Sequence, residues 1–284
     1  MNNIQKNRLK DQLFKIWGIT ATLIGLILLV VFIGDILIDG IRRIDWEFII
    51  NLPSRKPEKS GIYTALMGSI WILGLTTLIA FPIGVAAAIY LEEYAKKNRF
   101  SAFLEINISN LAGVPSIIYG LLGLEVFVRV MNLGASVLAG SLTLSLLILP
   151  IVIVATRESI KAVPGSIKDA SYALGASKWQ TIWNQILPAS SGGILTGVIL
   201  ALSRAVGETA PLIVVGALAY VPFAPESPMD GFSVLPIQIF NWISRPQHGF
   251  IENAAAAIII LLAVTFVMNG IAVYFRNKWQ KKLK

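Results

Sequence analysis

The sequence predicts an all-α membrane protein with six transmembrane helices. Of its 284 residues, 55% are apolar and only 14% are charged, and the mean hydropathy is +0.71. A soluble domain carries about a quarter charged residues, so the shortage of charge here indicates long segments that face lipid. Strand-like alternation is absent, and only helices or closed barrels satisfy the backbone in a bilayer. We therefore expect the apolar segments to be helices.

Six apolar runs are long enough to cross the hydrocarbon core, which needs about 20 helical residues. The first run follows Lys6, Arg8, Lys10 and Lys15, as in a signal peptide, but it is longer than such a segment and no cleavage site follows it. We expect an uncleaved first span after a short tail, 1–15. The six predicted spans are 16–38, 64–91, 106–131, 136–155, 192–220 and 254–275.

The distribution of basic residues predicts the orientation of the six-helix domain 16–275. Sixteen Lys and Arg lie in the tails and loops on one side of the spans, and six lie on the other. The side with more basic residues faces the cytoplasm, so both termini and the loop 157–190 are expected there, with loops 39–63 and 221–253 outside. Within the second outer loop, the apolar stretch 234–243 predicts a short re-entrant or interfacial helix.

Composition excludes several classes of function. The chain has no Cys and a single His, His248, in a loop, which excludes thiolate and multi-histidine metal sites. The net charge is +8, but the basic residues lie at the ends of apolar runs, so we expect no nucleic acid to bind. The phosphate-binding pattern G-x-x-x-x-G-K-[ST] is absent. We therefore expect no catalytic residue, no metal and no cofactor on this chain.

The loop 157–190 has the pattern of two short helices. Ser166, with Asp169 three residues later, resembles a capping box at the start of the first helix. Gly175 is expected to end that helix, and Ser177 to cap the second. Pro188 is expected to end the loop at the next span.

Three aromatic residues, Tyr172, Trp179 and Trp183, are expected to be exposed on this helix pair. An amphipathic, aromatic knob of this kind suits docking into the groove of a partner protein. A helix that lies on the membrane surface, held by Trp and Lys, is the alternative. The pattern alone favours neither.

The fifth span contains two charged residues, Arg204 and Glu208, which are i and i+4 in the sequence and so predict one helix face. Arg204 lies twelve residues after 192, or about 18 Å into the span, near the middle of the bilayer. An Arg at that depth costs about 2.5–3.5 kcal/mol, which favours a cavity or a partner for its charge. The planar guanidinium of Arg204 can donate two parallel hydrogen bonds to the oxygens of phosphate. Thr209 follows Glu208 directly in the sequence. The alternative is a structural ion pair that ties the span to its neighbours.

Three other groups of charge are expected to be structural or secondary. Glu125 and Arg129 are also i and i+4, but they lie near the outer end of the third span, where long side chains reach the interface. Arg157 lies at the inner end of the fourth span, where positive charge is expected, and a role in anion exit is the alternative hypothesis. The basic tail 276–284 is expected to anchor on anionic lipid.

Four segments resemble the permease subunits of ABC-type importers. S-R-A-V-G-E-T-A-P-L at 203–212 is very similar to the R-A-[IV]-G-E-T-A-P segment of phosphate-importer permeases, and 114–120 and 156–158 resemble their V-P-S-[IV]-[IV]-Y-G and T-R-E segments. In the cytoplasmic loop, Asp169, Gly175, Leu187 and Pro188 keep the spacing of the E-A-A-x3-G-x9-I-x-L-P loop. The loop departs from that pattern at Asp169, at Ser171 and at Gln185.

The resemblance implies a MetI-like, PstA-type permease in the plasma membrane. It implies four partners: a PstC-like second permease, a dimeric PstB-like ATPase that binds the ATP and Mg²⁺, an external PstS-like phosphate-binding protein, and membrane lipid. It assigns the phosphate path to Arg204, Glu208 and Thr209. It assigns docking on the ATPase to Asp169, Ala170, Gly175, Trp179, Leu187 and Pro188.

Three other functions are the alternatives to this one. A permease for another oxyanion is of the same class, and the 203–212 segment argues against it. A stand-alone ion-coupled carrier often has internal repeats and more spans, and it has no need of a docking loop. An intramembrane enzyme requires a nucleophile and base or a metal constellation in the spans, which this sequence lacks.

Overall fold

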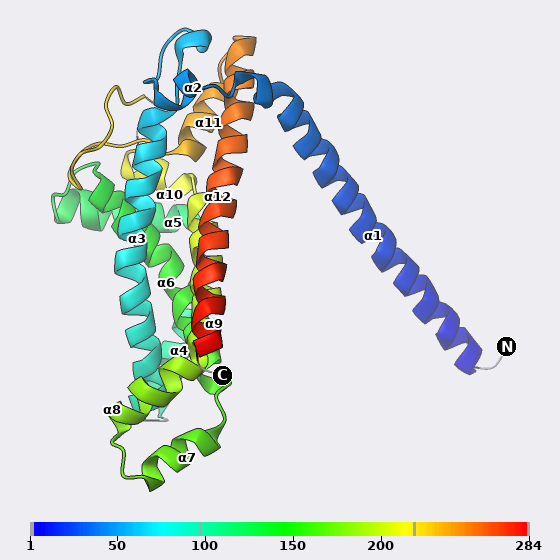
Figure 1. The fold of residues 1–284 in the computed structure, drawn as a ribbon, viewed down its shortest axis with the longest axis vertical. Helices are drawn as coiled ribbons and strands as arrows, with labels where there is room; N and C mark the ends of the chain where they lie inside the picture. Colours follow the sequence, from blue (N-terminus) through cyan, green and yellow to red (C-terminus); the bar gives the residue numbers. More distant parts are fainter. Residues whose placement is uncertain (1–2, 97, 218–219, 283–284) are drawn as a thin grey trace.

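The computed structural model describes residues 3–96, 98–217 and 220–282, and every regular element in these ranges is a helix. Five of the described helices are long and apolar enough to cross a membrane, and a bent helix pair makes a sixth span if it is counted as one crossing. Figure 1 shows most of the helices side by side in a tall bundle, from which the first helix departs.

The bundle is built around α6, which packs against α3 on one side and α9 on the other. In the 18-residue apolar stretch of α6, 67% of the residues are buried, against 6% in the corresponding stretch of α1. Helix α6 therefore belongs to the core of the bundle, and α1 does not. The elements are α1 (Asn3–Gly40), η1 (Ile41–Arg43), α2 (Trp46–Ile50), η2 (Pro57–Lys59), α3 (Tyr63–Ile89), η3 (Tyr90–Tyr94), α4 (Arg99–Leu111), α5 (Ser116–Gly123), η4 (Leu124–Val130), α6 (Val137–Lys161), α7 (Gly165–Ala173), α8 (Lys178–Thr181), η5 (Ile182–Ile186), α9 (Leu187–Val206), α10 (Ala210–Val215), α11 (Leu235–Ile243) and α12 (His248–Lys282).

The predicted third span, 106–131, is not one continuous helix. It is divided between α4, which begins at Arg99, and α5 with the π-helix η4, and the two parts meet at an angle of 105°. Pro115 stands at the break, where its missing N–H and its ring prevent the helix from continuing. The Tyr119 hydroxyl donates to the Leu111 carbonyl oxygen at 2.8 Å, which satisfies the exposed end of α4 across the bend.

The predicted fifth span, 192–220, also has different limits. Its helix begins earlier, because α8, η5 and α9 follow one another without a break, and it ends at Val206. A three-residue gap follows, and then the short helix α10 begins with Pro211 in its first turn, where a missing N–H is tolerated. Residues 218–219 of the predicted span lie outside the described residues.

Proline therefore breaks two of the four spans in which it occurs. Pro115 and Pro211 stand at the two breaks, whereas α3 continues through Pro82 and α6 through Pro150. The breaks in the third and fifth spans are the structural feature that positions the candidate site.

One end of the bundle is closed by α2, α11 and the start of α12 (Figure 1). The apolar stretch 234–243 forms α11, as expected, and its Trp242 is fully buried between Phe48 and Phe250, with ring centroids 5.9 and 6.4 Å away. The opposite end carries α7 and α8, and the C-terminal end of α12 lies toward it. The predicted tail 276–284 is helical as far as Lys282, and residues 283–284 lie outside the described part.

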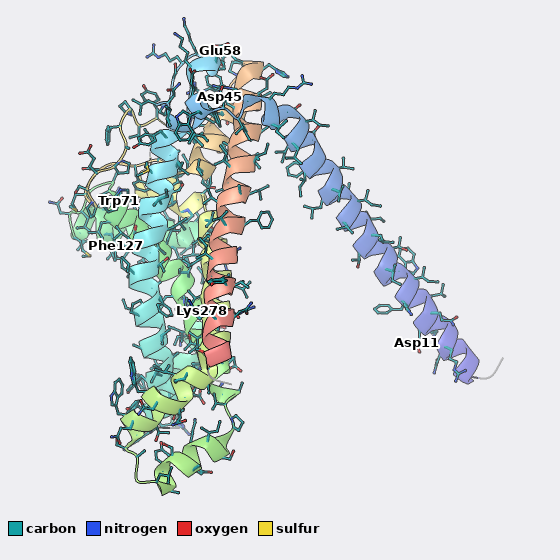
Figure 2. All side chains as sticks on the ribbon, in the orientation of Figure 1. Asp11, Asp45, Glu58, Trp71, Phe127 and Lys278 are labelled. Carbon is teal, nitrogen blue, oxygen red and sulfur yellow. The ribbon has the colours of Figure 1, made fainter. Side chains whose placement is uncertain are left out.

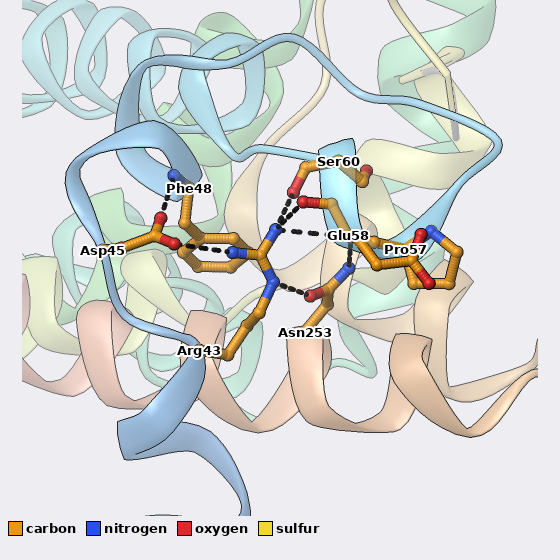
Figure 3. A network of polar contacts seen from close by, with 7 residues as sticks. All are labelled: Arg43, Asp45, Phe48, Pro57, Glu58, Ser60 and Asn253. Atoms are coloured by element: carbon orange, nitrogen blue, oxygen red, sulfur yellow. Dashed lines mark hydrogen bonds and ion pairs between the residues drawn. The ribbon is translucent and has the colours of Figure 1, made fainter.

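Arg43 ties the loop between α1 and α3 to α12 (Figure 3). Its Nε donates to Asn253 Oδ1 at 2.8 Å, and its guanidinium lies 4.9 Å from the centre of the Phe48 ring. The remaining nitrogens reach the Asp45 carboxylate and the carbonyl oxygens of Pro57, Glu58 and Ser60. Because one side chain satisfies four backbone or carboxylate acceptors and a buried amide, this loop is a fixed part of the bundle end.

The first helix is joined to the bundle only near its C-terminal end. Contacts of α1 are with α12, beside Gly40, and over most of its length the helix stands apart from the bundle with exposed side chains (Figure 2). Leu13, Phe14 and Trp17 are among the many exposed apolar residues. Residues 1–2 of the predicted tail 1–15 lie outside the described part, and the helix is already formed at Asn3.

Candidate functional site

The two charged residues of the fifth span lie at its break. Arg204 is in the last turn of α9, and Glu208 follows the end of that helix, with its N–H donating to the Ala205 carbonyl oxygen at 3.2 Å. Arg204 Nε donates to Glu208 Oε1 at 3.3 Å. The two side chains do meet, but Glu208 lies in the gap before α10, so the prediction of one continuous helix face is wrong.

The position of Arg204 along the span also differs from the prediction. The apolar helix that carries it runs from Lys178 to Val206, so Arg204 lies at the end of a 29-residue helix and not near the middle of one that starts at 192. Its side chain is 41% exposed in the isolated chain, whereas that of Glu208 is 15% exposed. The carboxylate therefore faces the bundle, and the guanidinium is the more accessible partner.

Glu208 enters a small gap in the bundle. It lines a cavity of about 10 Å³ together with Ser69 of α3 and Val234 of the segment before α11. A cavity of this size holds at most one water molecule. Thr209, beside it, precedes α10, and its hydroxyl donates to the Gly207 carbonyl oxygen at 3.4 Å instead of capping the helix.

The broken third span packs directly on the broken fifth span. A Cβ on Gly120 would lie 2.7 Å from Pro211 Cα and 3.0 Å from the Pro211 carbonyl oxygen, so α5 and α10 touch backbone to backbone at that point. Arg204 is near enough to interact electrostatically with the Tyr119 side chain. The segments 114–120 and 203–212, far apart in the sequence, thus form one structural unit around Arg204.

The loop at the other end of the bundle forms the expected two helices with different starts. The first, α7, begins at Gly165 and is preceded by Pro164, so Ser166 lies inside the helix and the predicted capping box with Asp169 is not formed. Gly175 ends the turn with a φ of +83°, a conformation that Gly adopts at little cost. Ser177 caps α8 with a complete capping box to Gln180.

One polar contact joins the two helices of the pair, and a second ties α7 to η3. The Ser171 and Thr181 hydroxyls lie 2.9 Å apart and are both buried, which joins α7 to α8. Ser171 is the position where the resemblance expects Ala, and its hydroxyl has a partner that Ala would lack. Lys168 of α7 forms an ion pair with Glu93 of η3, whose side chain is 6% exposed.

The residues predicted to dock on a partner fall into three places. Asp169 and Ala170 are exposed on α7, and Leu174, beside Gly175 at its tip, is 90% exposed. Trp179 stacks on Trp183, with ring centroids 5.6 Å apart, along the side of α8 and η5 that faces α3. Leu187 and Pro188 do not end the loop, because they lie in the first turn of α9, which continues from η5.

A model of the family described as "Binding-protein-dependent transport system inner membrane component" matches residues 80–281. The chain belongs to this family. It is similar to the phosphate transport system permease protein PstA of Mycobacterium leprae (34% identical, over 91% of this chain and 86% of that one). It is similar to PstA of Haemophilus influenzae (34%, over 91% of each chain) and to the probable ABC transporter permease protein YqgI of Bacillus subtilis (32%, over 88% and 90%).

Solved structures of ABC transporters have the same fold. A chain of a bacterial alginate ABC transporter superposes with a TM-score of 0.70 over 99% of both chains at 14% identity. A chain of the MetNI methionine ABC transporter superposes with a TM-score of 0.62 over 77% of this chain and 97% of that one at 15% identity. The predicted MetI-like permease fold is confirmed. The chain is a multi-pass plasma-membrane protein, and membrane subunits of this family are generally non-catalytic.

The permease also contains an ionic cluster around a buried arginine that local sequence patterns did not predict. Arg157, at the end of α6, is 7% exposed, and its Nη2 lies 2.9 Å from Glu105 Oε1 of α4 and 3.5 Å from Glu92 Oε2 of η3. Lys161 lies 4.0 Å from Glu92 and 3.0 Å from Glu158. The cluster joins three segments at the α7–α8 end, beside a cavity of about 430 Å³. In the sequence, only the T-R-E resemblance at 156–158 pointed to the residues of this cluster.

Among the residues that the structure describes, no three His, Cys, Asp or Glu side chains form a group that could hold a metal ion.

Proposed function

We propose that the chain is the permease subunit of an ATP-driven importer of inorganic phosphate, with Arg204, Glu208 and Thr209 on the phosphate path. The observation that carries the proposal is the half-exposed Arg204 guanidinium at the junction of two broken spans. Helix breaks at membrane depth are tolerated where they line a cavity or a path, and they are typical of substrate sites in transporters. The relatives named PstA support phosphate as the anion.

The geometry of the pair fits a reversible anion site. The Glu208 contact uses Arg204 Nε, and no contact within the described chain engages the two Nη nitrogens. These two nitrogens are the donors of a bidentate contact with a phosphate group. Glu208 balances the Arg204 charge between transport events, which lowers the cost of holding a cation in the membrane.

The proposal extends to the partners. A second, PstC-like permease would complete the path. A dimeric, PstB-like ATPase would receive α7 and its tip at Asp169, Ala170, Leu174 and Gly175. A PstS-like binding protein would deliver phosphate at the end closed by α2 and α11, and ATP and Mg²⁺ would be bound by the ATPase. The exposed apolar tip of α7 favours a docking role over a solvated loop.

Phosphate uptake into proteoliposomes that contain the whole complex tests the site. We expect Arg204→Ala to abolish uptake while the complex still assembles and hydrolyses ATP. Arg129→Ala is the matched control, because Arg129 forms an i, i+4 pair with Glu125 at 2.9 Å, with both side chains more than 60% exposed. Unchanged uptake in Arg204→Ala would leave the pair as a structural tie. Uptake of sulfate or molybdate in place of phosphate would favour the other-oxyanion function.

A further inference from the structure

A long apolar groove runs along the outside of the bundle between α3 and the helix formed by α8, η5 and α9. Its volume is about 720 Å³, within the range of ligand sites in proteins. One wall runs from Phe81 to Tyr94, and the other runs from Trp179 to Leu195. No residue that lines it is charged.

The groove changes character along its length. At the α7–α8 end its rim consists of four aromatic residues with polar tips, Tyr90, Tyr94, Trp179 and Trp183, all between 44% and 60% exposed. Farther along, the walls are aliphatic or phenyl groups, apart from Ser191, whose hydroxyl donates to the Pro188 carbonyl oxygen of its own helix at 2.7 Å. Tyr and Trp gather where a bilayer changes from headgroups to hydrocarbon. The groove therefore has the polarity profile of one membrane leaflet.

Its length agrees with that of one leaflet. Along the wall formed by α3 and the start of η3, Tyr90 at the rim and Phe81 at the far end are nine residues apart, which is about 14 Å at 1.5 Å per residue. One leaflet contributes about half of the roughly 30 Å hydrocarbon core, or about 15 Å. An acyl chain that starts at the rim would thus reach the end of the groove.

Both walls are π-helical at the rim. Tyr90–Tyr94 is the π-helix η3, and Ile182–Ile186 is the π-helix η5, so three of the four rim aromatics, Tyr90, Tyr94 and Trp183, are carried by π-helical turns on opposite walls. The fourth, Trp179, lies in α8 just before η5. π-Helical turns cost stability relative to α-helix and occur frequently at functional sites. Their presence on both sides is an independent indication of a ligand at this rim.

A cation is fixed beside the rim. Lys178 Nζ lies 4.9 Å from the centre of the Tyr94 ring, next to Trp179. The neighbouring acidic residue of η3, Glu93, is paired with Lys168. Lys178 therefore keeps its charge available at the level where a lipid phosphate lies.

We propose that this groove is a binding site for one anionic phospholipid, with an acyl chain between α3 and α9 and the headgroup phosphate at Lys178. Trp179 and Trp183 then belong to the lipid site. Because the lipid would contact both α3 and the start of the helix that leads from the α7–α8 loop, it would fix the angle between them. The inference does not depend on which anion is transported.

The test measures lipid retention by the full chain. The protein is reconstituted in vesicles of equal phosphatidylcholine and phosphatidylglycerol, extracted in mild detergent and examined by native mass spectrometry. We expect one retained phosphatidylglycerol, and Ala86→Phe, which fills the groove from its open side, to abolish retention. Lys178→Gln should lower the preference for phosphatidylglycerol about fivefold. Ile83→Phe and Lys278→Gln are the controls outside the groove and should behave as wild type.

Three results would overturn the proposal: equal retention of both lipids by wild type, undiminished retention by Ala86→Phe, or no retained lipid at all. A second measurement covers the case in which Ala86→Phe does not fold. The chain has no Cys, so Ala86→Cys gives it a single site for a benzophenone label, which is attached before the chain is assembled into the whole complex. Adducts with phospholipid are expected, and adducts with another protein chain would show that a partner helix occupies the groove.

Discussion

Gly120→Ala should separate the two broken spans and impair transport. The added methyl carbon would lie 2.7 Å from Pro211 Cα and 3.0 Å from Val214 Cβ. Carbon atoms pack at about 3.5 Å or more, so α5 and α10 would have to move apart by about 0.8 Å. Overpacking of this kind costs about 1–3 kcal/mol, and here the nearest atoms belong to backbone that cannot rotate away.

The displacement matters because α10 begins two residues after Glu208. A shift of α10 would change the position of Glu208 relative to Arg204, whose ion pair is already long at 3.3 Å. We therefore expect uptake to fall more than tenfold in proteoliposomes of the whole complex, with a lower melting temperature of the purified chain.

Gly113→Ala is the matched control for this prediction. Gly113 lies in the same break of the third span, but a Cβ there would meet only the Asn110 carbonyl oxygen, at an ordinary 3.5 Å. Its uptake and melting temperature should be close to those of wild type. Normal uptake in Gly120→Ala, or an equal loss in Gly113→Ala, would refute the argument that the α5–α10 contact positions the site.

Three further predictions concern the ends of the bundle. Gly175→Ala should cost about 1–2 kcal/mol because its φ is +83°, and it should reduce co-purification of the ATPase; Gly175→Asn, which tolerates this conformation, should reduce it less. Ser171→Ala leaves the buried Thr181 hydroxyl unpaired at a cost of about 1–3 kcal/mol in thermal unfolding, and adding Thr181→Val should restore most of the stability. Arg43→Lys keeps the positive charge but loses the planar guanidinium that donates to several acceptors at once. We expect it to lower the free energy of unfolding by about 2 kcal/mol, whereas Arg42→Lys, at an exposed position, should have no effect.

Hydropathy predicted where the chain crosses the membrane but not where the crossing helices break. The runs around 112–115 and 207–209 stay apolar on average, so a window of about 20 residues passes over both gaps. Pro115 and Pro211 mark the breaks, yet Pro82 and Pro150 have the same local effect and do not interrupt their helices. The difference lies in packing with neighbouring helices, which a single sequence does not contain.

The candidate site was predicted in part for the same reason. The Arg204–Glu208 contact follows from local spacing, and it is present even though the helix ends between the two residues. The contact of Gly120 with Pro211, and the cluster of Arg157 with Glu92 and Glu105, join segments that are distant in the sequence. No local spacing rule relates such residues, so these features required the three-dimensional arrangement.

The unbroken helix from Lys178 to Val206 has a mechanical consequence. Its 29 residues span about 43 Å, with the α7–α8 loop at one end and Arg204 at the other. A helix that moves as a rigid body transmits displacement from one end to the other. If it pivots about its centre, a displacement of about 3 Å at Lys178 produces a displacement of about 3 Å in the opposite direction at Arg204. If the α7–α8 loop docks on an ATPase as proposed, the three non-helical residues after Val206 would be the joint at which movement of the loop opens and closes the Arg204–Glu208 ion pair.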